Sequence, residues 1–251
     1  MVWNNLPTVP ASLDTRQQLA SIFRILNHFR FTDLIHTHSS ARIEESEDTL
    51  LINRYDLLFH EVTATNLVEI DEEGQRRPGN DHLRVNFAGC NIHSAIHKAR
   101  PDVKFVIHTH TRAGAAVSAQ AEGLLPISQQ AMMFHDAVGY HDFEGFVLSR
   151  EERATLARDL GMNKALILRN HGLIVVGRTV AEAVNRIYNL ERACEIQIAA
   201  QSGNTPLVVP AHSIQAHLGA QADAQVQLDI EQMAWEACLR LIENEGTDYR
   251  L

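Results

Sequence analysis

Apolar residues recur every three to four positions in several stretches of the chain, a spacing typical of amphipathic helices. The clearest stretch runs over 12–30. Ser149 with Glu152, and Thr179 with Glu182, form capping-box patterns at two helix starts. Helices are expected over 12–30, 91–100, 111–121, 149–160, 179–201 and 222–243.

Shorter apolar runs between these segments predict strands. Several of them follow one another too closely for a crossover helix, which favours a mixed or antiparallel sheet covered by helices. The whole chain, 1–251, is expected to form one domain, with 203–251 as its connector, last helix and tail. Strands are expected over 33–38, 49–53, 66–71, 104–110, 165–168 and 173–176.

Composition narrows the range of functions. The chain has 251 residues and a formal net charge of -9, without a long basic run, so neither nucleic acid nor a membrane is an expected partner. No signal peptide is expected, and no apolar run approaches 20 residues. Three widely spaced cysteines suit a reducing compartment. These features predict a cytoplasmic protein.

The strand over 104–110 contains the strongest chemical signal. His108 and His110 are two residues apart, so their side chains point to the same face of a strand and can converge on one metal ion. His171, between two apolar runs, is the best candidate for a third ligand. Three neutral imidazoles leave coordination positions open, as in catalytic metal sites.

Other residues have weaker claims. His93 and His97 are four apart on a predicted helix, a spacing that can itself hold a metal, but a structural role is the expectation for this pair. Glu191 is expected either to accept a hydrogen bond from a ligand imidazole or to lie solvated on its helix. Arg112 could neutralise an anionic substrate or simply start a helix. Further candidates for lining the pocket are His135, Tyr140, His141 and Glu144.

The motifs taken together resemble the class II aldolase/adducin family. They are His93-Ser94-Ala95-Ile96-His97, Ala99-Arg100-Pro101-Asp102, His108-Thr109-His110 and Asn170-His171-Gly172, and the resemblance covers about residues 15–202. It implies a three-layer α/β/α fold around a mainly antiparallel sheet. It also implies a divalent metal on His108, His110 and His171, with zinc the first expectation and manganese, cobalt or iron the alternatives. Family members are commonly tetramers.

The chain departs from the family where its sugar-phosphate aldolases bind phosphate. Gly89 stands where the family's acid/base glutamate would be, and Asn53-Arg54-Tyr55-Asp56 replaces a Thr-Pro-Thr-Gly loop. Thr37-His38 replaces a Gly-Asn turn. His38, Asn53, Tyr55 and Gly89 are therefore expected to contact a substrate other than a sugar phosphate, and no general acid or base is assigned.

These observations predict a metal-dependent carbon–carbon lyase, either an aldehyde-lyase or a carboxy-lyase, acting on a small oxo- or hydroxy-acid. A bound metal would stabilise an enolate in either reaction, and decarboxylation needs only a proton donor afterwards. A Gly89→Glu variant that gained aldol activity would support this interpretation. Two alternatives are a non-haem iron oxygenase and an interaction module like the adducin head, without catalysis.

Overall fold

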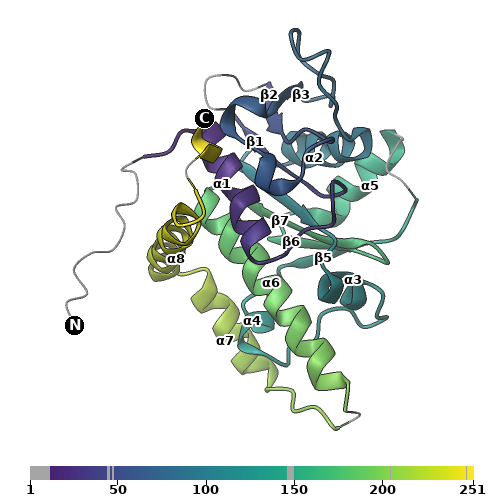
Figure 1. The fold of residues 1–251 in the computed structure, drawn as a ribbon. Helices are drawn as coiled ribbons and strands as arrows, with labels where there is room; N and C mark the ends of the chain where they lie inside the picture. The colour runs from purple at the N-terminus through teal and green to yellow at the C-terminus, as the bar shows by residue number, and fades with distance from the viewer. Residues whose placement is uncertain (1–11, 44–45, 47, 146–149, 204, 247) are drawn as a thin grey trace, which may run out of the picture.

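The computed structural model describes residues 12–43, 46, 48–145, 150–203, 205–246 and 248–251. Within these residues, seven strands form one sheet in the order β3-β2-β1-β4-β7-β6-β5 (Figure 1). Neighbours are antiparallel except β5 and β6, which are parallel. The strands are β1 (His38–Arg42), β2 (Thr49–Ile52), β3 (Val68–Asp71), β4 (Phe105–Thr109), β5 (Val138–His141), β6 (Ala165–Leu168) and β7 (Gly172–Gly177).

Helices cover both faces of the sheet, so the predicted three-layer fold is confirmed. Along one face lie α1, α6 and α8, and along the other lie α2 and α5 (Figure 1). The helices are α1 (Thr15–His28), α2 (Phe87–Ala99), α3 (Arg112–Ser118), α4 (Gln129–Met132), α5 (Arg150–Leu160), α6 (Val180–Gln201), α7 (His212–Ala222) and α8 (Gln225–Glu243). The part of the chain that the structure describes also contains three short 3-10 turns, Phe59–Glu61, Ala64–Asn66 and Asp248–Arg250.

Strand β4 runs through the centre of the sheet, and all five of its residues are buried. Its side chains alternate between the two layers. Phe105 and Ile107 pack with α1, α6 and α8 in the larger core, whereas Val106 packs with α2 and α5. His108 has the same parity as Val106 and therefore lies on the face that α2 and α5 cover.

Three segments differ from their sequence-based expectations. The strand expected over 33–38 is a turn, because Leu34 takes a left-handed φ of 49° that no strand permits, and β1 begins only at His38. The connector expected over 203–221 contains helix α7. No strand is expected around Tyr140, but this segment forms β5, which the parallel pairing with β6 holds in place.

One helix start differs from its expectation, and one capping box is only half formed. Helix α2 begins at Phe87 rather than near Asn91, with Asn86 accepting a hydrogen bond from the Gly89 backbone N–H at 3.2 Å. Thr179 caps α6 as predicted by accepting from the Glu182 N–H at 3.1 Å. The Glu182 carboxylate accepts from the Arg178 N–H instead of completing the box. Ser149 lies outside the described residues.

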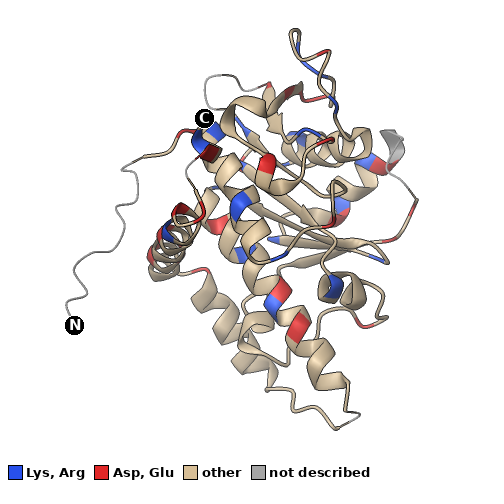
Figure 2. Cartoon of the chain, viewed as in Figure 1, with Lys and Arg blue, Asp and Glu red and all other residues tan. Residues whose placement is uncertain are grey.

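Residues of both charge signs are interspersed along α6 and α8, whereas α7 contains no Lys, Arg, Asp or Glu (Figure 2). None of the helices within the described residues is long and apolar enough to span a bilayer.

Candidate metal centre

Two histidines are positioned by the end of β4. His108 is the fourth residue of the strand, and His110 follows its last residue. Strand β4 pairs with β1 on one side and with β7 on the other, so the backbone that carries His108 is fixed from both edges. The rings of His108 and His110 have centroids 4.6 Å apart.

The turn between β6 and β7 carries the third histidine. Asn170 has a left-handed φ of 58°, which turns the chain and directs His171 towards β4. Ser118 anchors this turn, because its hydroxyl accepts a hydrogen bond from the His171 backbone N–H at 3.1 Å. Gly172 is required for close packing, since a Cβ there would lie 2.3 Å from the carbonyl oxygen of Thr109. The Asn-His-Gly motif thus has a structural reason at each position.

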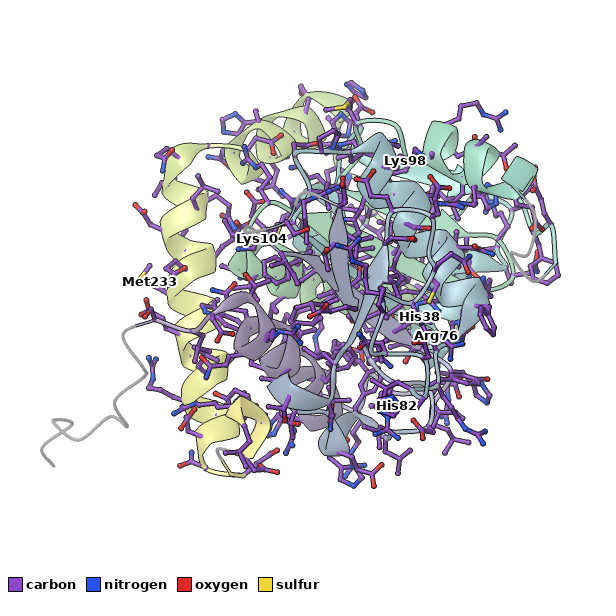
Figure 3. All side chains as sticks on the ribbon, turned by 90° about the horizontal axis from the view of Figure 1, so that it is seen from above. His38, Arg76, His82, Lys98, Lys104 and Met233 are labelled. Carbon is purple, nitrogen blue, oxygen red and sulfur yellow. The ribbon has the colours of Figure 1, made fainter. Side chains whose placement is uncertain are left out.

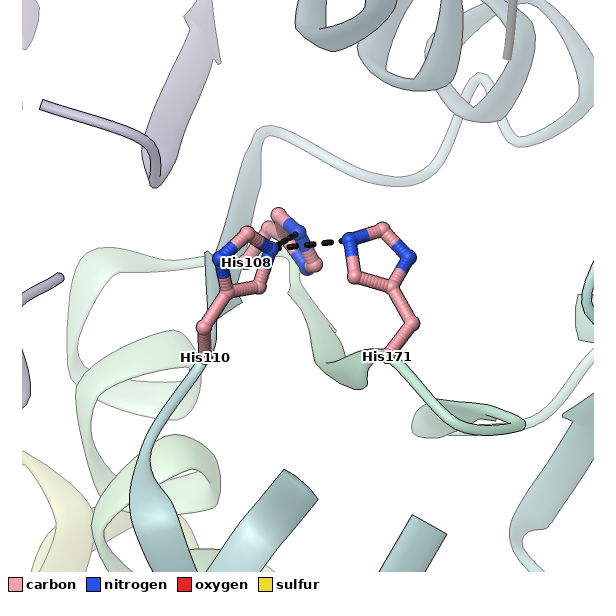
Figure 4. Close-up of side chains that lie close together, drawn as sticks. All are labelled: His108, His110 and His171. Carbon is pink, nitrogen blue, oxygen red and sulfur yellow. Dashed lines mark hydrogen bonds between the residues drawn. The ribbon is translucent and has the colours of Figure 1, made fainter. Parts of the chain in front are cut away.

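The three rings converge through their Nε2 atoms (Figure 4). Nε2 of His110 lies 2.8 Å from Nε2 of His108 and 2.8 Å from Nε2 of His171. His108 is fully buried, and the other two are partly exposed. The structure therefore brings together the three residues that the sequence marks as metal ligands.

Hydrogen bonds on the outer side of two rings set their protonation. Nδ1 of His108 donates to the carbonyl oxygen of Leu173 at 2.9 Å, and Nδ1 of His110 donates to the carboxylate of Asp33 at 3.1 Å. A neutral ring that carries its proton on Nδ1 has a lone pair on Nε2. Two lone pairs facing each other at 2.8 Å repel, and a cation between them removes that repulsion. The donor set therefore fits a metal ion.

The local environment keeps these rings neutral. Burial lowers the pKa of His108 well below its usual value, and the imidazoles of His38 and His110 lower it further. Burial lowers the pKa of His171 to about 4. Burial also lowers the pKa of His110, although the carboxylate of Asp33 opposes that shift. All three are therefore neutral at pH 7, the form in which imidazole binds metals.

His38 lies beside this cluster, on the same face of the sheet as His108. It is the register partner of His108 across β1 and β4, and the two ring centroids are 4.8 Å apart. Figure 3 shows His38 within the body of the molecule, and only 4% of its surface is exposed. Burial lowers its pKa well below the usual value, so the imidazole is neutral at pH 7.

Gly89 leaves room for the His38 ring. A Cβ at this position would lie 2.5 Å from Cδ2 of His38 and 2.7 Å from its Nε2. Asn53, also expected near substrate, is buried and accepts a hydrogen bond from the Ser39 backbone N–H at 3.3 Å. The Tyr55 ring packs beside His36, with centroids 6.5 Å apart.

The weaker expectations have different outcomes. Both expectations for Glu191 are wrong, because it is buried and accepts its hydrogen bond from the Thr111 hydroxyl, not from an imidazole, and burial raises its pKa to about 7. His93 and His97 both contact Ser40, in agreement with the structural role expected for them. The reason is that α2 lies over β1, which turns both rings into the protein core.

The remaining candidates are divided between the site and its surroundings. Arg112 lines a cavity of about 710 Å³ together with His110, Thr111 and Glu191. His141 and Glu144 border a smaller cavity beside His171. Tyr140 packs in the larger core, and the His135 ring packs against that of His212.

Asp33 and Ser40 are site residues that the sequence did not single out. Each stands in a short polar stretch without a recognisable motif, and each acts through a partner more than 50 positions away. Ser40 lies outside the strand expected over 33–38 and enters a strand only because β1 runs over His38–Arg42.

Comparisons with known proteins agree with this geometry. The sequence model described as Class II Aldolase and Adducin N-terminal domain matches residues 17–198. The crystal structure of an aldolase II superfamily protein from Pseudomonas syringae is 45% identical and superimposes with a TM-score of 0.90, covering 98% of both chains.

Two further relatives mark the range of the similarity. L-fuculose 1-phosphate aldolase from Glaciozyma antarctica is 26% identical, with a TM-score of 0.82 over 98% of both chains. Alpha-adducin from Mus musculus is 39% identical over 92% of this chain, which spans 33% of the adducin.

Proposed function

The chain belongs to the class II aldolase and adducin family, and on this basis we propose that it is a divalent-metal-dependent carbon–carbon lyase. The substrate class that we propose is a small oxo- or hydroxy-acid or a related carbonyl compound. The reaction is a decarboxylation or an aldol cleavage. The observation that carries the proposal is the convergence of three Nε2 atoms within 4.8 Å of one another, two of them unprotonated.

His108, His110 and His171 would hold the metal, and zinc is the ion we propose first. When bound, a divalent ion supplies Lewis-acid stabilisation of the negative charge that develops on a substrate oxygen as the carbon–carbon bond breaks. Asp33 and the Leu173 carbonyl orient two of the ligand rings through their Nδ1 atoms. Because Nδ1 carries the ring proton in both residues, the Nε2 atoms that would bind the metal are already unprotonated.

The cavity beside His110 gives a substrate access to this centre. Its volume, about 710 Å³, accommodates a small organic acid with room for water. Arg30 and Arg112 line it and would attract an anion. The His38 ring fills the space beside Gly89, so a carboxylate side chain has no room at this position. The lack of this carboxylate favours decarboxylation, because that reaction needs no proton abstraction.

Metal content tests the proposal directly. We expect about one divalent ion per chain in untagged protein, and the same in His82→Ala, which removes an exposed histidine outside the cluster (Figure 3). His108→Ala should lose the ion. Oxaloacetate, acetoacetate and hydroxyketones are then screened with the loaded protein. Stoichiometric iron with oxygen consumption would instead indicate an oxygenase.

A binding role is the second candidate, and the 39% identity to alpha-adducin favours it. Under this reading the fold serves as an interaction module. Protein that takes up no metal even after soaking would favour this binding role over the enzyme. For the enzyme we further propose a cytoplasmic homo-oligomer, with a tetramer favoured by the family, and size-exclusion chromatography with light scattering checks that state.

A further inference from the structure

A line of buried polar side chains runs from the cluster into the protein. Nδ1 of His38 lies 2.8 Å from Nε2 of His93, whose Nδ1 lies 2.5 Å from the Ser40 hydroxyl. The same hydroxyl lies 2.8 Å from Nε2 of His97. All four side chains are at most 4% exposed. We call these four residues the histidine chain.

Every link of the histidine chain holds one proton, so the position of one proton determines all the others. Ser40 has a single hydroxyl hydrogen and must donate to one ring and accept from the other. If His97 donates through Nε2, Ser40 donates to His93, and His93 donates to Nδ1 of His38. His38 then carries its own proton on Nε2.

The far end of the histidine chain favours this direction. Nδ1 of His97 is buried and has no hydrogen-bond partner among the described residues. Folded proteins leave buried N–H groups unpaired less often than buried acceptors. This unpaired Nδ1 is therefore better accommodated as an acceptor without a proton. The reverse order would put that proton on Nδ1, where the nearby Val103 carbonyl lies outside hydrogen-bond geometry, and would leave Nε2 of His38 unprotonated.

The near end of the histidine chain meets the candidate metal centre. The His38 ring stands 4.8 Å from that of His108, on the same face of the sheet. Within the described part of the chain, Nε2 of His38 makes no hydrogen bond. Gly89 presents no side chain to cover this nitrogen, and a Cβ there would approach within 2.7 Å of it.

Resting on the proposed function, we propose that His38 is a neutral hydrogen-bond donor to a substrate oxygen, through Nε2–H, and that Ser40, His93 and His97 are positioning residues that fix this tautomer. The oxygen belongs to a small carbonyl acid or its enolate. A fixed N–H donor interacts more strongly as negative charge grows on that oxygen, and it needs no reorganisation during the reaction. His38 therefore stabilises charge without exchanging a proton.

Nitrogen-15 NMR on metal-free protein labelled at histidine tests the tautomer. We expect the Nε2 signal of His38, assigned by its absence in His38→Gln, at the pyrrole-type position, and its Nδ1 signal at the pyridine-type position. Ser40→Ala should introduce the second tautomer. Ser39→Ala is the matched control, because Ser39 neighbours Ser40 on the same strand and its buried hydroxyl has no partner in the described residues. A pyridine-type Nε2 in the unmodified protein would overturn the proposal.

Binding of acetohydroxamate to zinc-loaded protein tests the donor role. This probe offers anionic oxygens without any reaction. His38→Leu should keep the zinc content and weaken acetohydroxamate binding about tenfold or more, as expected for a hydrogen bond to a charged group. Equal affinity in both proteins would refute the donor role. Failure to bind zinc at all would instead contradict the proposed function, and the NMR result would stand independently of it.

Discussion

The contact between Gly89 and His38 leads to a quantitative prediction. Alanine normally stabilises a helix interior relative to glycine, by up to about 1 kcal/mol. At Gly89, however, the new Cβ would lie 2.5 to 2.9 Å from three atoms of the His38 ring. The ring cannot move away freely, because His93 holds its Nδ1 on the other side.

Overpacking of this kind costs about 1–3 kcal/mol, so we expect Gly89→Ala to lower the free energy of unfolding by about 2 kcal/mol. In a His38→Ala background the clash is gone, and the same change should stabilise the protein by up to about 1 kcal/mol. The coupling free energy between the two positions is then about 3 kcal/mol, at the upper end for residues in contact.

Urea unfolding followed by circular dichroism measures all four proteins of this double-mutant cycle. If Gly89→Ala were neutral in the unmodified protein, or had the same effect in both backgrounds, the argument that the His38 ring fills this space would be wrong. The cycle also bears on Gly89→Glu, which meets the same obstacle and requires His38→Ala beside it before a gain of aldol activity can be expected.

Three further changes test other parts of the site. Asp33→Asn should weaken metal affinity about 10- to 100-fold, because His110 loses its charged partner, and competition with a chelator measures this. Glu191 has a pKa of about 7 when folded, above its unfolded value, so the protein should lose stability as pH rises from about 5 to 7. Glu191→Gln should remove that loss and be more stable at pH 8 by up to about 3 kcal/mol, with no difference near pH 4.5 in urea unfolding. Gly172→Ala should lower stability by about 3 kcal/mol in the same assay, since its Cβ would meet the Thr109 carbonyl oxygen at 2.3 Å, and a neutral result would refute the close approach of these strands.

Periodicity was sufficient for the elements that bury a clear apolar face. Helix α1 is one, since Leu19, Phe23 and Leu26 recur at helical spacing and are all buried. It failed at β5, where four residues form a strand because the neighbouring β6 offers a parallel partner. It also failed at 33–38, because the left-handed conformation of Leu34 leaves no trace in the pattern of apolar residues.

The candidate site shows the same division. The convergence of the three histidines could be predicted, because a two-residue spacing on a strand fixes the direction of His108 and His110, and His171 stands between two apolar runs that predict strands. The contacts that set the tautomer of His38 could not be predicted from the sequence. Ser40 and His93 lie 53 positions apart, and only the packing of α2 over β1 brings them together.

The antiparallel pairing of β4 with β7 determines when the centre can assemble. The bond from His108 to Leu173 joins residues 65 positions apart, so it forms only after a long loop has closed. In a nascent chain from which β7 is still missing, only two of the three candidate ligand histidines have been made. The Leu173 carbonyl that orients the His108 ring is also absent. Whatever ion the cluster holds would therefore be captured late in folding, and it would then stabilise the finished sheet at its centre.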